Sequence, residues 1–130
     1  MPEFMSKGKI LIIDDEKATH LLLKAVLKND YEITSAFDAD EGLNQINDNF
    51  FDLLLLDIQL PGTDGFKLLE KLKKEKKKGG LPVLMITGDA NSNVKAKAKT
   101  SGASGIIEKS ILLSDKKSFL MQVAKTITTG

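Results

Sequence analysis

The sequence of 130 residues contains no cysteine and no arginine, and it has only one histidine and three prolines. Without cysteine, neither disulfide bonds nor thiolate zinc sites are available. Arginine is the commonest bidentate reader of guanine edges, so its absence argues against sequence-specific recognition of DNA. The single histidine, His20, excludes a multi-histidine metal site, and we expect it on a helix surface without a functional role.

An excess of one charge and a long apolar run are also missing. Nineteen lysines balance eighteen acidic residues, and the net charge of +1 predicts no general attraction to nucleic acid or to an anionic membrane. The apolar run at 53–56 is far shorter than the roughly 20 residues of a membrane-spanning helix, and no secretory signal opens the chain. We therefore expect a cytoplasmic protein that binds neither nucleic acid nor membrane directly. The lysines between 67 and 78 are expected to form a solvated helix face.

The remaining composition suits one compact domain. Hydrophobic residues make up 42% and charged residues 28% of the chain. A domain of this size buries roughly two-thirds of the surface that its unfolded chain exposes, so it can fold without disulfide bonds or a structural metal. Residues 1–8 are expected to be an expression scar and an N-terminal tail, because a second methionine follows at Met5, and residues 9–130 form the single domain.

Short apolar runs alternate with helical patterns along the chain. The predicted strands occupy 9–13, 31–36, 51–56, 81–86 and 102–108. The predicted helices occupy 17–29, 39–47, 66–78 and about 92–99, followed by a last helix capped by Ser114. This alternation predicts the α/β class: a doubly wound, five-stranded parallel sheet of flavodoxin-like order 2-1-3-4-5, with five helices on its two faces.

Polar residues follow the ends of these predicted strands. Asp14 and Asp15 follow the first strand, Asp57 the third, Thr87 the fourth and Lys109 the fifth. Open parallel sheets bind ligands at this edge, where the first and third strands are neighbours. Because crowded carboxylates repel one another, their convergence predicts a cation, and oxygen-only ligands favour Mg²⁺. With a hydroxyl and an ammonium group at the same edge, the pattern predicts a phosphoryl site.

Four segments of the sequence, in order, carry a family resemblance. From Lys9 to about Thr126 the chain resembles the receiver domain of the response regulators of two-component signalling, including the chemotaxis receivers. The matching segments are 10–16, 52–62 with Asp64-Gly65, 81–87, and Gly102-Ala103 with Lys109.

The resemblance implies a phosphoacceptor and a metal site. Asp57 would accept a phosphoryl group from a histidine kinase or a histidine phosphotransfer protein. Asp15, Asp57 and the backbone carbonyl of Gln59 would bind Mg²⁺ directly, and Asp14 would help through a water molecule. Glu16, which follows them, is expected to be a helix-start charge rather than a metal ligand.

The resemblance also implies a switch. Lys109 would pair with Asp57 and then with a phosphoryl oxygen, Thr87 would donate its hydroxyl to another oxygen, and Gly88 would leave room for access. Such a protein is a signalling switch that catalyses its own phosphorylation and dephosphorylation, rather than an enzyme that turns over an outside substrate. Its output partner would be a downstream target protein or an effector domain lost from this chain.

Two positions depart from the family pattern. Ile106 stands where the family usually has a tyrosine or phenylalanine that turns inward on activation. Ser110 replaces the proline that usually follows the lysine through a cis peptide, and because a cis bond before a non-proline residue costs about 2.5 to 4 kcal/mol, we expect a trans bond or a disordered loop.

These departures keep open a second hypothesis, a receiver-like binding module that works without phosphorylation. A phosphatase of the haloacid dehalogenase type is disfavoured, because Gln59 stands where that class has its second aspartate.

Overall fold

Five parallel strands form the central sheet in the computed structural model, which describes residues 8–75 and 80–129. Their order is β2-β1-β3-β6-β7, and every pairing is parallel, as predicted. The strands are β1 (Gly8–Ile13), β2 (Tyr31–Ala36), β3 (Leu53–Asp57), β6 (Val83–Thr87) and β7 (Gly105–Glu108). The expected tail at 1–7 and the expected helix end at 76–79 lie outside the described residues.

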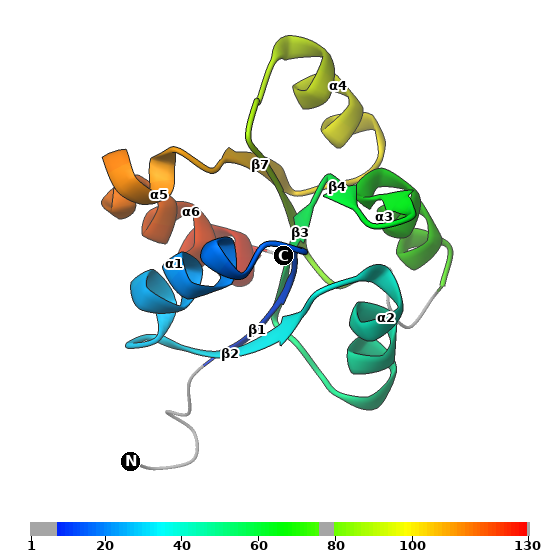
Figure 1. The fold of residues 1–130 in the computed structure, drawn as a ribbon, viewed down its shortest axis with the longest axis horizontal. Helices are drawn as coiled ribbons and strands as arrows, with labels where there is room; N and C mark the ends of the chain where they lie inside the picture. Colours follow the sequence, from blue (N-terminus) through cyan, green and yellow to red (C-terminus); the bar gives the residue numbers. More distant parts are fainter. Residues whose placement is uncertain (1–7, 76–79, 130) are drawn as a thin grey trace.

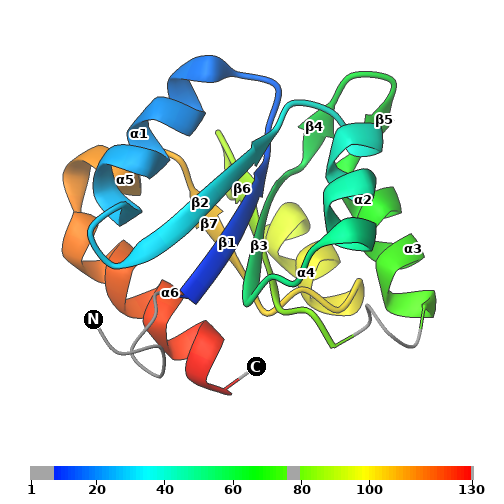
Figure 2. The ribbon, with the colours of Figure 1, turned by 90° about the horizontal axis from the view of Figure 1, so that it is seen from below.

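Helices cover both faces of this sheet (Figures 1 and 2). One face is covered by α1 (Lys17–Leu27), α5 (Ile111–Ser114) and α6 (Lys116–Thr129), and the other by α2 (Ala39–Asp48), α3 (Gly65–Lys74) and α4 (Ser92–Thr100). The predicted α/β doubly wound class is therefore confirmed. No helix among the described residues is long and apolar enough to cross a membrane.

Two hydrophobic clusters hold these layers together. Alternate residues of a strand point to opposite faces, so Ile10 and Ile12 pack beneath α1 and α6, whereas Leu11 and Ile13 pack beneath α2 and α3. The four leucines of β3 are fully buried because the strand has helices on both sides. Each such side chain stabilises the fold by about 1.5–3 kcal/mol.

The observed secondary structure differs from the prediction in two places. Where only a loop was expected, β4 (Gln59–Leu60) and β5 (Thr63–Asp64) form a small antiparallel hairpin. Its turn uses Gly62 at a φ of 75°, which glycine adopts without strain.

The predicted cap of the last helix was also wrong. Ser114 ends the additional short helix α5, and Asp115 caps α6 instead. The Asp115 carboxylate accepts hydrogen bonds from the backbone nitrogen and the hydroxyl of Ser118, at 3.1 and 2.6 Å. The described chain therefore has six helices rather than five.

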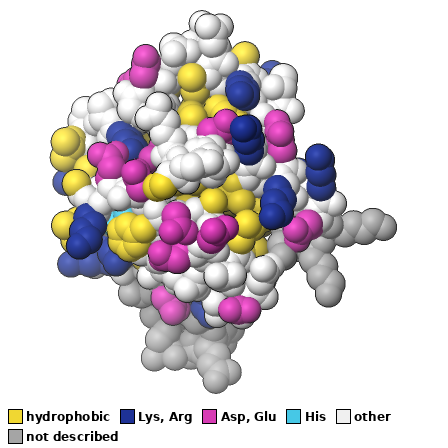
Figure 3. Space-filling view, turned by 45° about the vertical axis from the view of Figure 1, so that its right-hand side comes forward, with side chains coloured by type: hydrophobic (Ala, Val, Ile, Leu, Met, Phe, Trp, Pro, Cys, Tyr) yellow, Lys and Arg dark blue, Asp and Glu magenta, His cyan; other side chains and the backbone are white. Residues whose placement is uncertain are grey.

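Lysine side chains are spread over the described surface on the side of α3 and are interspersed with acidic and neutral groups (Figure 3). This distribution agrees with the expected solvated face. No described peptide bond is cis, so the bond between Lys109 and Ser110 is trans, and Ser110 leads directly into α5.

Candidate functional site

The carboxyl ends of four strands bring the predicted polar residues together. Ile13 pairs with Leu56, so Asp14, which follows β1, lies beside Asp57 at the end of β3. The end of β6 lies next to β3 and β7, where Thr87 pairs with Glu108. A cleft of about 660 Å³ opens at this edge, lined by Asp15, Glu16, Asp57, Gln59, Leu60, Pro61, Thr87, Gly88 and Lys109.

Three carboxylates line this cleft, and a fourth, that of Asp14, belongs to the same cluster. Asp14 is fully buried and Asp57 is 5% exposed, whereas Asp15 and Glu16 are exposed. Each offers one oxygen, and these oxygens all lie within 4.8 Å of one another. The Oδ1 atom of Asp14 accepts a hydrogen bond from the backbone nitrogen of Glu16 at 2.8 Å, and Oδ1 of Asp57 accepts one from that of Gln59 at 3.2 Å.

The Lys109 ammonium is the cation shared by three of these carboxylates. Its Nζ lies 2.7 Å from Oε1 of Glu16, 3.1 Å from Oδ2 of Asp14 and 3.5 Å from Oδ2 of Asp57. Burial by itself lowers the pKa of Lys109, but the hydrogen bond to Glu16, the ion pair with Asp14 and the charge of Asp57 raise it above its ordinary value. Lys109 is therefore a fixed positive charge. In return, its hydrogen bond lowers the pKa of Glu16.

Asp57 has the opposite electrostatic balance. Burial, followed by the negative charge of Asp14, raises its pKa from 3.8 to about 6, although Lys109 and the hydrogen bond from Gln59 oppose this change. One ammonium is thus insufficient to neutralise the buried pair of aspartates.

The oxygen donors present fit a divalent cation. The buried Oδ2 atom of Asp14 accepts no hydrogen bond from the described residues, and its ion-pair partner there is Lys109. A second positive charge placed among the four carboxylates would relieve their repulsion. An all-oxygen set with room for water suits Mg²⁺ better than a transition metal.

Thr87 and Gly88 border the cleft on the β6 side. The Thr87 hydroxyl donates to the backbone oxygen of Asp89 at 3.3 Å and accepts from its backbone nitrogen at 3.2 Å, so it is held in a local turn. A Cβ atom added to Gly88 would meet open space. Ile106 lies outside the cleft on β7, partly buried against the cluster beneath α3 and α4.

The expectation that His20 lies on the helix surface was wrong. The side chain is 2% exposed, and its Nε2 and Nδ1 atoms lie 2.6 Å from the backbone oxygen of Asp14 and 2.8 Å from Oγ of Ser35. Its position in α1, three residues before Leu23 and seven before Leu27, was a signal for the buried face.

Sequence reasoning also missed two residues that shape the cleft. Glu16, expected to be a helix-start charge, is the nearest ion-pair partner of Lys109. Gly65 passes so close to β3 that a Cβ atom there would overlap the backbone oxygen of Asp57, and its nitrogen donates to Ile58 at 2.5 Å. The Asp64-Gly65 pair was a signal for a tight backbone approach.

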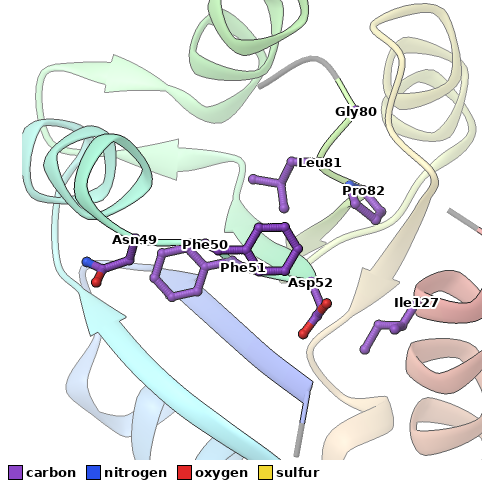
Figure 4. A pocket seen from close by; sticks show the side chains of 8 residues that line it. All are labelled: Asn49, Phe50, Phe51, Asp52, Gly80, Leu81, Pro82 and Ile127. Atoms are coloured by element: carbon purple, nitrogen blue, oxygen red, sulfur yellow. The ribbon is translucent and has the colours of Figure 1, made fainter. Parts of the chain in front are cut away.

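A second cavity lies at the opposite end of the sheet, before β3 and β6. It measures about 300 Å³ and is lined by Asn49, Phe50, Phe51, Asp52, Gly80, Leu81, Pro82 and Ile127 (Figure 4). Its one carboxylate, Asp52, accepts a hydrogen bond from the backbone of Lys9 at 2.7 Å. This cavity has no set of converging charges, so the cleft at Asp57 is the candidate site.

Comparison with known proteins agrees with this geometry. The family model of the response regulator receiver domain matches residues 10–120. The sensor protein EvgS of Escherichia coli (strain K12) is 32% identical over 124 residues, which are 95% of this chain and 10% of EvgS. The response regulator PleD of Caulobacter vibrioides is 35% identical over 105 residues, which are 80% of this chain and 23% of PleD. The chain therefore spans only a small part of these two relatives.

A solved structure supports the same relationship. The crystal structure of a CheY-like response regulator receiver domain protein from Methanospirillum hungatei JF-1 matches with a TM-score of 0.82 and 33% sequence identity. The match covers 95% of this chain and 96% of that protein, so the similarity extends over the whole domain.

Proposed function

Because this chain belongs to the response regulator receiver domain family, whose members are signalling switches, we propose that Asp57 accepts a phosphoryl group from a phosphohistidine. The observation that carries this proposal is the pairing of a nearly buried aspartate at the end of β3 with the Lys109 ammonium, 3.5 Å away, in an open cleft. The donor would be a histidine kinase or a histidine phosphotransfer protein, and the proposed place of action is the cytoplasm.

The proposed metal is Mg²⁺. Asp15, Asp57 and the backbone carbonyl of Gln59 would hold it, and Asp14 would assist through a water molecule. When bound, Mg²⁺ would neutralise the crowded carboxylates and the negative charge that spreads over the transferring phosphoryl group. The buried Asp14 Oδ2 atom, which accepts no hydrogen bond from the described residues and shares its one ion-pair partner with two other carboxylates, supports this assignment.

The remaining steps follow from the chain's own residues. A carboxylate oxygen of Asp57 forms a bond to phosphorus while the bond from phosphorus to the donor's ring nitrogen breaks. The electron pair stays on that nitrogen, which takes a proton from solvent. Lys109 would move from Glu16 and Asp14 toward a phosphoryl oxygen, where its positive charge would stabilise the negative charge of the transition state. Hydrolysis of the acyl phosphate would reset the switch.

The proposed output begins at Thr87. The phosphoryl group of an acyl phosphate carries about −1.5 to −2 charges, by analogy with phosphorylated hydroxyls, and these replace the single charge of the carboxylate. The hydroxyl of Thr87 would leave the backbone oxygen of Asp89 and donate to a phosphoryl oxygen, so the loop that contains Gly88 would move. Ile106 cannot act as a rotating aromatic, and the change would therefore reach the target protein or effector domain through backbone and loop movement.

A receiver-like module that binds its partner without phosphorylation is the second candidate. It is favoured by Ile106 and Ser110 and by the two hydrogen bonds that hold Thr87 on Asp89. In this alternative, Lys109 and the acidic residues would keep the domain in one binding state.

Intact mass after incubation with acetyl phosphate distinguishes the two. Wild-type protein should gain the mass of one phosphoryl group with Mg²⁺ and none with EDTA, and Asp57→Asn should gain none. A folded wild-type protein that gains no mass under acidic quench would overturn the phosphoacceptor assignment and favour the binding module.

A further inference from the structure

His20 connects helix α1 to the first acidic residue of the cleft without touching the cleft itself. Its ring lies between the β1–α1 loop, strand β2 and the loop after β2, where its centroid is 4.2 Å from that of the Phe37 ring. The ring is 2% exposed and is absent from the cleft lining, so it contacts no ligand there. The ring therefore reaches the site through its hydrogen bond to Asp14.

The hydrogen bond to Asp14 determines which ring nitrogen carries a hydrogen. A backbone oxygen can only accept, so Nε2 of His20 carries the hydrogen in its 2.6 Å contact with Asp14. In the neutral ring, Nδ1 then accepts from the Ser35 hydroxyl at 2.8 Å. Both nitrogens are satisfied, and the ring has one orientation.

This bond completes the immobilisation of Asp14. Its backbone nitrogen donates to the backbone oxygen of Ala36 at 3.2 Å, and its Oδ1 accepts from the backbone nitrogen of Glu16 at 2.8 Å. With His20 on the backbone oxygen, three polar groups of Asp14 are tied to the fold. Oδ2 remains directed at Lys109 and the carboxylate cluster.

We infer that His20 is a positioning residue for the metal site: it holds the Asp14-Asp15 turn in the geometry that binds Mg²⁺. The inference rests on the proposed function, because it assigns His20 to the same site. A purely structural histidine would contribute to the stability of the fold only, whereas a positioning histidine also determines metal affinity. Groups that orient metal ligands from outside typically change affinity by about 10- to 100-fold when they are removed.

Two substitutions test the hydrogen bonds of the two ring nitrogens separately. In His20→Gln the side-chain amide nitrogen can reach the place of Nε2 and donate to Asp14. In His20→Asn the shorter amide reaches only the place of Nδ1 and keeps the bond to Ser35. Val123→Ala, a cavity variant in the cluster beneath α6, is the control for general loss of stability.

The test is isothermal titration of the full chain and its variants with Mg²⁺, alongside urea unfolding. We expect His20→Gln and Val123→Ala to retain the wild-type dissociation constant and His20→Asn to weaken it about tenfold. The positioning role would be overturned if His20→Asn bound Mg²⁺ as tightly as wild type, or if His20→Gln and His20→Asn were weakened equally. Either result would leave the proposed metal site itself intact. A wild-type protein that binds no Mg²⁺ would instead overturn the proposed metal site, and the inference with it.

Discussion

Replacing Asp57 by asparagine is expected to stabilise the metal-free protein. The carboxylate is 5% exposed and lies beside the buried Asp14, and these two conditions raise its pKa to about 6. Asparagine has nearly the same shape and removes the negative charge. Its side-chain oxygen can still accept the hydrogen bond from the Gln59 backbone.

The magnitude follows from the pKa. An increase from 3.8 to about 6 corresponds to a destabilisation of the ionised folded state by about 3 kcal/mol. The attraction to Lys109 is already included in this value, because it opposes the increase. Local rearrangement around the new amide reduces the gain, so we expect Asp57→Asn to raise the free energy of unfolding by about 1–3 kcal/mol near pH 7.

The pH dependence has a definite sign. The folded pKa lies above the unfolded one, so the folded protein binds more protons between about pH 4 and pH 6. Above the folded pKa, the ionised Asp57 carboxylate therefore destabilises the folded state. As the pH falls, protonation of this carboxylate in the folded state removes the destabilisation. The advantage of Asp57→Asn should shrink as the pH falls from about 6 to about 4, and it should vanish only below the unfolded pKa of 3.8, where the carboxyl is protonated in both states.

Urea unfolding followed by circular dichroism in EDTA, near pH 7 and near pH 4.5, measures this difference. Asp48→Asn, which removes an exposed carboxylate from α2, is the matched control and should change stability by less than about 0.5 kcal/mol. The reasoning is refuted if Asp57→Asn is no more stable than wild type near pH 7, or if its gain is the same at both pH values.

Three further outcomes are expected. Lys109→Met should destabilise the metal-free protein by about 2–3 kcal/mol, because it leaves Asp14 and Asp57 without their counterion. Saturating Mg²⁺ should restore part of this loss in a thermal melt, and an undiminished loss would contradict the proposed metal site. In wild type, Mg²⁺ should raise the melting temperature, whereas Asp57→Asn should show a smaller increase. Gly65→Ala should destabilise by about 1–3 kcal/mol through overlap with the Asp57 backbone, while Gly80→Ala, which meets no atom, should be nearly neutral in the same urea titration.

Much of the fold was predictable because both faces of the sheet are buried. Strands such as Ile10–Ile13 consist of apolar residues without a break, a pattern typical of parallel strands covered by helices. Polar residues that follow such runs must lie at one edge of the sheet. The sequence alone therefore predicts that Asp14, Asp57 and Lys109 belong to one site.

The missed features depend on contacts between segments that are distant in sequence. The pairing of Glu16 with Lys109 joins residues 93 positions apart, and two charged side chains give no local sign that they will meet. The sequence places no partner beside His20, which is why it is expected at the surface, although its helical spacing from Leu23 matches the buried face. The overlap that restricts position 65 involves the backbone of β3, and the Asp64-Gly65 pair is the only sign of it in the sequence.

The wide sequence separation within the cleft also has a kinetic consequence. The carboxylates and the ammonium come from the ends of β1, β3 and β7, so they approach one another only after strands from both halves of the chain have docked. Contacts of such long range form late when the transition state is organised around nearer strand pairs. The electrostatic repulsion at Asp57 would then destabilise the native state and hardly affect the transition state for folding. We therefore expect Asp57→Asn to slow unfolding while leaving the folding rate nearly unchanged, which the two limbs of a chevron plot in EDTA would measure.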